Sequence, residues 1–147
     1  MRYNTAERIA AKFSKPKAME KEVRVYWGVT RSGKSHNAWL EAGEDAYSKD
    51  PRSKFWCGYN GQENMVIDEF RGGIDISHML RWLDKYPVTV EIKGSSMPLS
   101  VRKVWITSNI HPRDWYPDAD QETKNALLRR LKITEYPAAY GSFPNGY

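Results

Sequence analysis

The sequence contains very little cysteine and no long apolar run, and each shortage excludes a class of protein. Cys57 is the only cysteine, so an internal disulfide framework and a zinc site built of cysteines alone are both excluded. One cysteine is typical of a reducing, intracellular setting, where we expect it to be a small buried apolar group. No stretch reaches the roughly eighteen apolar residues of a membrane span, and the charged start lacks the apolar core of a secretory signal. We therefore expect no membrane partner.

The composition is that of one globular domain with a small excess of positive charge. Of 147 residues, 40% are apolar and 28% are charged, and the formal net charge is +5. Residues 1–24 hold seven basic and three acidic side chains, which gives a net charge of +4. The segment 93–103 has three basic residues and no acid. Such a distribution permits a polyanionic partner without requiring one.

Alternating strand and helix patterns predict an α/β domain with a mainly parallel sheet. Apolar or β-branched runs predict strands at 23–27, 55–57, 65–67 and 101–107. Capping residues and apolar spacing predict helices at 5–13, 34–42, 76–83 and 121–131. Between the third helix and the last strand, residues 88–96 alternate and then reach a Gly-Ser-Ser tip, which predicts a projecting hairpin.

One motif follows the first predicted strand and opens the second predicted helix. It matches the pattern G-x-x-x-x-G-K-[ST] at every fixed position and reads Gly28-Val29-Thr30-Arg31-Ser32-Gly33-Lys34-Ser35. The two glycines let the backbone curl until its N–H groups surround phosphates at a helix N-terminus. Lys34 would reach the β- and γ-phosphates, and Ser35 would place its hydroxyl on Mg²⁺. The motif predicts a nucleotide site, against the alternative of a glycine turn that binds nothing.

Polar side chains follow two further predicted strands. Asp68 and Glu69 come directly after the run Met-Val-Ile, and Asn109 ends the run Val-Trp-Ile-Thr-Ser-Asn. Open parallel sheets bind ligands at the carboxyl ends of their strands. There Asp68 would hold Mg²⁺, Glu69 would act as general base, and Asn109 would orient the attacking water. The alternatives are a solvated acidic surface and an asparagine that caps a loop.

The order of these motifs resembles the superfamily 3 helicases of small DNA viruses, which are AAA+ ATPases. The chain is more similar to the replication-initiator proteins of circoviruses and related circular single-stranded DNA viruses. The stretches that carry the resemblance are FWCGY at 55–59, VIDEF at 66–70, YPVTVEIKG at 86–94, WITSN at 105–109 and LLRRL at 127–131. The resemblance implies an AAA+ core that binds ATP and Mg²⁺, and a location in the host nucleus.

In that family the ATPase is a hexameric ring, and each site receives an arginine from the neighbouring subunit. Arg129 and Arg130 stand where the family places this arginine, and we prefer Arg130; the alternative is that both stabilise a helix dipole. The predicted hairpin resembles the family's loop that grips single-stranded DNA in the channel of the ring. Its residues Lys93, Gly94 and Ser95 are therefore expected to bind DNA.

The resemblance also predicts how the chain divides. We expect a short helical, basic segment at 1–22 as a remnant of the oligomerisation region, the ATPase at 23–136 and an irregular tail at 137–147. Full initiators of this family carry an upstream nuclease with a His-x-His metal motif. His36, His78 and His111 have no such spacing, so we expect an isolated helicase domain.

Together these patterns predict an ATP-dependent DNA helicase or translocase of viral rolling-circle replication. Two rival functions remain open at this point. A small-molecule kinase also uses a phosphate loop, although it does not explain the hairpin around Lys93. A nucleic-acid-binding module with a vestigial ATPase site is the second rival, although all the expected catalytic side chains are present.

Overall fold

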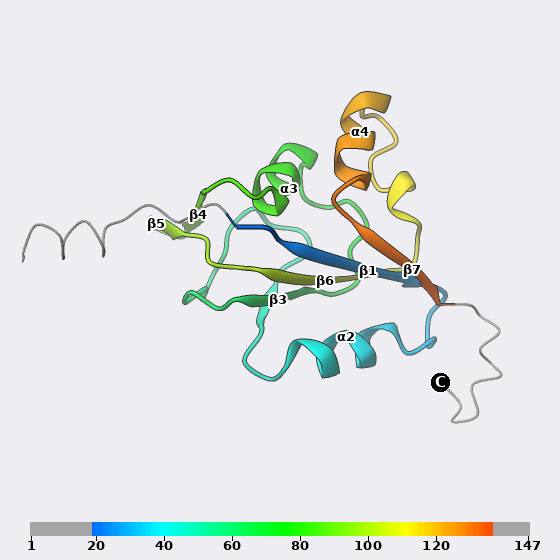
Figure 1. The fold of residues 1–147 in the computed structure, drawn as a ribbon, viewed down its shortest axis with the longest axis horizontal. Helices are drawn as coiled ribbons and strands as arrows, with labels where there is room; N and C mark the ends of the chain where they lie inside the picture. The colour runs from blue at the N-terminus through cyan, green and yellow to red at the C-terminus, as the bar shows by residue number, and fades with distance from the viewer. Residues whose placement is uncertain (1–18, 137–147) are drawn as a thin grey trace, which may run out of the picture.

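The computed structural model describes residues 19–136, which fold around a five-stranded parallel sheet. Its strands are β1 (Glu22–Gly28), β2 (Tyr47–Lys49), β3 (Asn64–Ile67), β6 (Lys103–Ser108) and β7 (Lys132–Tyr136). The order across the sheet is β2-β3-β6-β1-β7, and every neighbouring pair is parallel (Figure 1). The predicted α/β class is confirmed. The helix predicted at 5–13 and the tail predicted at 137–147 lie outside the described residues.

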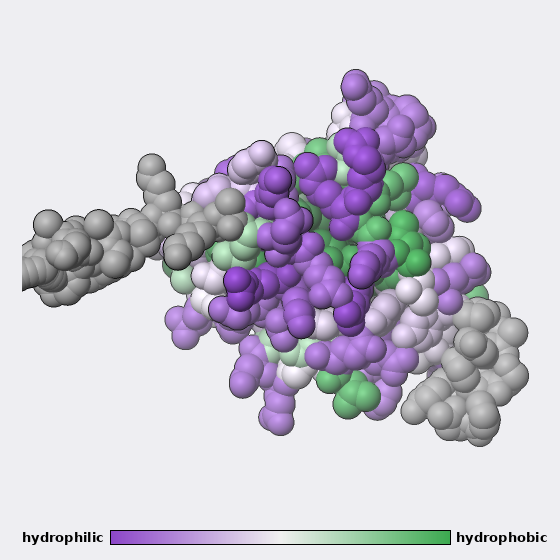
Figure 2. Space-filling view, in the orientation of Figure 1, coloured by the Kyte–Doolittle hydropathy of each residue, from purple (hydrophilic) through white to green (hydrophobic). Residues whose placement is uncertain are grey.

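Helices cover both faces of the sheet, so the strands are apolar on both sides. Helix α2 (Lys34–Ala42) lies on one face, whereas α3 (Ile76–Leu83) and α4 (Gln121–Leu128) lie on the other (Figure 1). Along β1, Val23 and Val25 enter the cluster beneath α3 and α4, and Tyr26 enters the cluster against α2. Hydrophilic side chains cover most of the face seen in Figure 2, with apolar side chains showing between α3 and α4. No helix within residues 19–136 is long and apolar enough to cross a membrane.

The helix boundaries follow from local hydrogen bonds. Asp75 caps α3 by accepting a hydrogen bond from the backbone N–H of Ser77, as the sequence predicts. Helix α4 ends at Leu128, three residues earlier than predicted. There the N–H groups of Arg130 and Leu131 bond to carbonyls three residues back, so the chain tightens before it enters β7.

A two-stranded hairpin projects from the amino end of the sheet, away from the carboxyl ends of the parallel strands (Figure 1). Its strands β4 (Thr89–Ile92) and β5 (Ser95–Pro98) pair antiparallel, with Ile92 opposite Ser95. Lys93 and Gly94 form the turn, and Gly94 takes the φ of +87° that a glycine adopts without strain. The predicted hairpin is confirmed, but its serines belong to β5 rather than to the tip.

The strand predicted at 55–57 is wrong, because these residues lie in the loop that connects β2 to β3. The aromatic character of this segment reflects burial instead of strand pairing. The Trp56 ring is fully buried, stacked 5.4 Å from Tyr47 and edge-on at 5.1 Å from Trp82. Cys57, expected to be buried, is exposed beside it.

Two lysines are held away from water. Lys49 is 1% exposed, and its ammonium donates to the backbone carbonyls of Asp50 and Ser53. Burial lowers the pKa of Lys49 to about 8, although Asp50 acts in the opposite direction. Burial likewise lowers the pKa of Lys21 to about 8, with its ammonium bound to the carbonyl of Trp82 at 2.7 Å.

These shifts predict that the free energy of unfolding rises between pH 8 and pH 10. In that window the unfolded chain, whose lysines titrate near 10.5, binds more protons than the folded chain. Each lysine should contribute about 2 kcal/mol to the rise, which urea denaturation at several pH values measures. Above about pH 10 stability should fall, because burial raises the pKa of Tyr26 and of Tyr47 to about 12.

Lys49→Met should remove the share of the rise that Lys49 contributes. Lys132→Met, at an exposed position on β7, should leave the profile unchanged. A flat profile from pH 8 to pH 10 in the unsubstituted chain would contradict this account.

Candidate functional site

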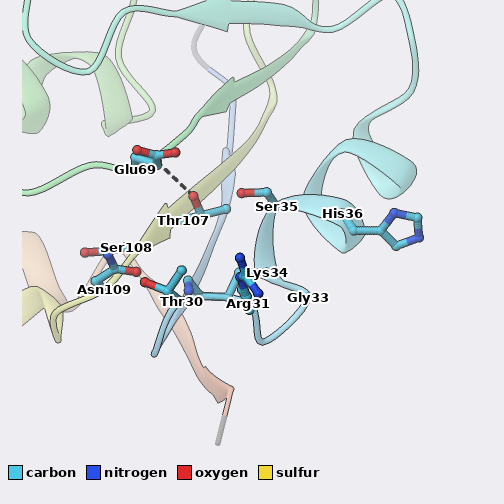
Figure 3. A pocket seen from close by; sticks show the side chains of 10 residues that line it. All are labelled: Thr30, Arg31, Gly33, Lys34, Ser35, His36, Glu69, Thr107, Ser108 and Asn109. Carbon is cyan, nitrogen blue, oxygen red and sulfur yellow. Dashed lines mark hydrogen bonds between the residues drawn. The ribbon is translucent and has the colours of Figure 1, made fainter. Parts of the chain in front are cut away.

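The three sequence motifs meet at one edge of the sheet. The phosphate-loop motif follows β1, the acidic pair follows β3, and Asn109 follows β6, and these strands are neighbours in the sheet. They surround a cavity of about 520 Å³ (Figure 3). It is lined by Thr30, Arg31, Gly33, Lys34, Ser35, His36, Glu69, Thr107, Ser108 and Asn109. Of the residues that these three motifs predict for the nucleotide site, Gly28, Val29, Ser32 and Asp68 lie outside this lining.

Glycines shape the loop between β1 and α2. A Cβ on Gly28 would stand 2.2 Å from the backbone oxygen of Tyr136, so only glycine lets β1 and β7 approach here. Gly33 precedes α2 with a φ of +92°. Arg31 also takes a left-handed φ, of +68°, which is uncommon for a residue with a side chain. The loop therefore curls toward the cavity before the helix begins.

The Lys34 side chain is folded over this loop and is 7% exposed. Its ammonium donates to the carbonyl of Val29 at 2.7 Å and to the hydroxyl of Ser32 at 3.4 Å. Burial lowers the pKa of Lys34, and the carboxylates of Asp68 and Glu69 partly oppose that shift. The loop thus holds a cation at the floor of the cavity, where an anionic ligand would be attracted.

Two oxygen groups face each other where the phosphate loop meets the acidic pair. The hydroxyl of Ser35 donates to the carboxylate of Asp68 at 2.7 Å. Hydroxyl and carboxylate oxygens are the hard ligands that Mg²⁺ prefers. Within residues 19–136 no group of three or more His, Cys, Asp or Glu side chains could hold a metal ion by itself. This donor set fits Mg²⁺, which usually takes one or two protein ligands and completes its shell with phosphate and water.

Thr107, a residue that the sequence analysis did not assign to the site, holds the acidic pair in place. Its buried hydroxyl donates to the carboxylate of Asp68 and accepts the backbone N–H of Glu69 at 2.9 Å (Figure 3). Glu69 has a left-handed φ of +56°, a conformation that costs roughly 1–3 kcal/mol and needs support from its surroundings. A hydroxyl at the end of an otherwise apolar strand was the available signal.

The segment after β6 carries Asn109 to the cavity. Ser108 is buried, and its hydroxyl accepts hydrogen bonds from the indole of Trp115 at 3.0 Å and from the N–H of Ile110 at 3.1 Å. The Trp115 ring packs edge-on against the ring of Phe70, the residue that follows the acidic pair, with the ring centres 4.8 Å apart. Asn109 is therefore held on a backbone that is fixed on both sides.

The arginines and the hairpin residues lie away from this cavity. Arg129 and Arg130 line a separate pocket of about 390 Å³ together with Glu20, Lys21, Leu83, Asp84 and Lys85. Arg130 is half-buried there, and its guanidinium donates to the carboxylate of Asp84 at 3.3 Å. Lys93, Gly94 and Ser95 are exposed on the hairpin at the opposite end of the sheet (Figure 1).

Comparison with known proteins shows which family this chain belongs to. A family model described as RNA helicase matches residues 24–110, more than half of the chain. The replication-associated protein of Porcine circovirus 2 is 44% identical over 88 residues, which are 60% of this chain and 28% of that protein. The replication-associated protein of Goose circovirus is 43% identical over 110 residues, 75% of this chain and 36% of that protein. The chain thus spans less than half the length of these curated relatives.

Solved structures of Hsp104 share the fold. A closed-state reconstruction of Hsp104 with ATPγS and casein aligns with 89% of this chain and 31% of its own, at a TM-score of 0.51 and 17% identity. The ADP complex of Hsp104 from S. cerevisiae aligns with 88% and 25%, at a TM-score of 0.50 and 18% identity. At this identity the likeness concerns the fold alone, and it agrees with the predicted α/β architecture of a mainly parallel sheet flanked by helices.

The position of Thr107 predicts a loss of stability on removal of its hydroxyl. Thr107→Val should lower the free energy of unfolding by about 1–3 kcal/mol, because the backbone N–H of Glu69 loses its acceptor and the Asp68 carboxylate loses a donor. Thr107→Ser keeps the hydroxyl and should retain most of that stability. Urea denaturation compares the three chains, and equal stability of the valine and threonine forms would refute the role of the hydroxyl.

Proposed function

The chain belongs to the RNA helicase family and is similar to the replication-associated proteins of circoviruses. On that premise we propose that it is an ATP-dependent translocase on single-stranded DNA. It would work as a hexameric ring and unwind duplex DNA during viral rolling-circle replication. The observation that carries the proposal is the joint placement of two sites. A three-part cavity occupies the carboxyl edge of the sheet, and a hairpin that exposes Lys93 at its turn projects from the opposite end.

The cavity has the groups that ATP hydrolysis requires. Lys34 would exchange its bonds to the loop for oxygens of the β- and γ-phosphates, while the backbone N–H groups at the start of α2 surround the phosphate chain. Ser35 and Asp68 would hold Mg²⁺, which neutralises charge on the phosphate oxygens when bound. Glu69 would take a proton from the attacking water, and Asn109 would orient that water beside the γ-phosphate.

Among the described residues, Arg31 of the loop itself is the only arginine that lines this cavity. Arg130 would supply a second arginine to the nucleotide of a neighbouring copy in the ring. Its pocket supports this role, since four cationic side chains there face only two acidic ones. An arginine that reaches the γ-phosphate from another subunit stabilises charge that develops during transfer. Arg129 is exposed beside it and is the second choice.

The hairpin would bind the DNA strand. Lys93 would contact phosphate, and Gly94 and Ser95 expose the backbone next to it. Six such turns around a channel would form a grip that depends on salt and not on base sequence. This arrangement separates the DNA contact from the chemical step, so the two can be tested with different substitutions.

Lys34→Ala should reduce ATP hydrolysis by at least about 100-fold, because it removes the cation at the phosphates. Lys93→Ala should instead lose the stimulation of hydrolysis by single-stranded DNA. The affinity of this variant for single-stranded DNA should also depend less on salt, with a slope of log K against log salt that is smaller in magnitude by about 0.7. Phosphate release with and without an oligonucleotide, and binding at several salt concentrations, measure both effects. Lys132→Ala, exposed on β7, is the matched control that should change neither.

Equal loss of DNA-free hydrolysis in the Lys34 and Lys93 variants would refute the assignment of Lys93 to DNA. Absence of any hydrolysis in the unsubstituted chain, with or without DNA, would refute the proposed function.

A further inference from the structure

One loop joins the two distant ends of the molecule. Strand β2 ends at the carboxyl edge of the sheet, where the acidic pair lies, and β3 begins at the hairpin end. Residues 50–63 therefore run the length of the sheet between the candidate nucleotide site and the hairpin (Figure 1). The contacts at the two ends of this segment, called here the crossing loop, indicate what it does.

At the nucleotide end, the crossing loop begins beside the acidic pair. Lys49, the residue before the loop, pairs with Ile67, the residue before Asp68. Lys49 and Asp68 also line one pocket of about 380 Å³. The carbonyl of Pro51 packs against Gly73, where an added Cβ would stand 2.9 Å from that oxygen. The start of the loop is thus in contact with the residues on both sides of the turn that carries Glu69.

At the hairpin end, the same loop is bound to β4. The backbone N–H of Trp56 donates to the carbonyl of Glu91 at 2.8 Å. Lys54 forms an ion pair with the Glu91 carboxylate at 3.2 Å. The ammonium of Lys93 lies 5.9 Å from the centre of the Phe55 ring. Three consecutive loop residues, 54 to 56, therefore contact the strand and turn that we assign to DNA.

Lys49 holds the first turn of the crossing loop in place. Its ammonium binds the carbonyls of Asp50 and Ser53, so it closes the first turn of the loop. It also lies 5.7 Å from the Trp56 ring centre and 5.2 Å from that of Trp82. Among the described residues no carboxylate lies within ion-pair distance of it. A buried ammonium without a carboxylate is costly to keep, and an apolar side chain of the same length would fill the space without that cost.

We propose that Lys49 is a positioning residue that fixes the crossing loop and thereby couples the acidic turn at the nucleotide site to the β4–β5 hairpin. The ammonium makes four contacts that a methylene chain cannot replace: two carbonyls and the Trp56 ring of the loop, and the Trp82 ring of α3, against which the loop is held. A displacement of the Asp68–Glu69 turn would reach the hairpin through this loop. The coupling role rests on the proposed function, whereas the mechanical link between loop and hairpin does not.

Amide hydrogen exchange of the 147-residue chain, without nucleotide or DNA, tests the link. In Lys49→Met, amides of residues 50–59 and 89–98 should exchange at least about tenfold faster, while those of β1 and α2 should be unchanged. Lys49→Arg keeps a cation with N–H donors and should restore most of the protection. Val23→Ala, in the core at the amino end of β1, is the control for general destabilisation.

Unchanged exchange at 89–98 in Lys49→Met would overturn the proposal, as would an equal increase at 89–98 in Val23→Ala. A second measurement tests the coupling itself. Lys49→Met should hydrolyse ATP without DNA at the unsubstituted rate but lose the stimulation that an oligonucleotide produces, and Lys49→Arg should regain it. Full stimulation in Lys49→Met would overturn the coupling. If the unsubstituted chain hydrolyses no ATP, the proposed function fails, and the exchange measurement still decides the link.

Discussion

The hydrogen bonds that pair β6 with β1 on one side and with β3 on the other hold three strand ends together, and the rest of the structure depends on that pairing. Each strand delivers one part of the site: a cation from the loop after β1, two carboxylates after β3 and an amide after β6. Because the strands are parallel, all three parts emerge at the same edge of the sheet. A strand that ran the other way would carry its part to the opposite edge. Thr107 then joins the parts, since its hydroxyl bonds to Asp68 and to the backbone of Glu69.

The arrangement keeps several costly features close to its working ends. Glu69 has a left-handed backbone, the Lys34 side chain is buried against its own loop, and Lys49 is buried with no carboxylate within ion-pair distance among residues 19–136. The two apolar clusters on either side of the sheet offset these costs by removing the strands from water. The cavity and the hairpin then lie at opposite ends of the sheet, and the crossing loop runs from beside Asp68 to the hairpin.

The sequence was sufficient to predict the residues that lie at the ends of strands. It was not sufficient to predict contacts between residues that are far apart along the chain. The positions of Lys34, Asp68 and Asn109 just after predicted strands were enough to predict a shared edge, because the carboxyl ends of parallel strands lie together. The role of Thr107 depends on bonds to residues 38 and 39 positions away, which no local pattern reveals. The prediction of a strand at 55–57 was wrong because the apolar side chain of Trp56 is used for stacking on Tyr47 within the core. It does not mark a segment that pairs with a neighbouring strand. The structure gives the places of the predicted site residues, whereas the roles assigned to all of them, Arg130 and Lys93 included, stay predictions.

The central claim is that the cavity binds a nucleotide whose site is completed by a neighbouring copy around DNA. Electron microscopy of the chain with Mg²⁺, a non-hydrolysable ATP analogue and a single-stranded oligonucleotide tests that claim most directly. We expect a ring of six copies, in which Arg130 of one copy lies at the γ-phosphate that Lys34 of the next copy binds. Lys93 of each copy should face the DNA strand. Single copies that carry the analogue, or a ring in which no arginine from a neighbour reaches the γ-phosphate, would contradict it.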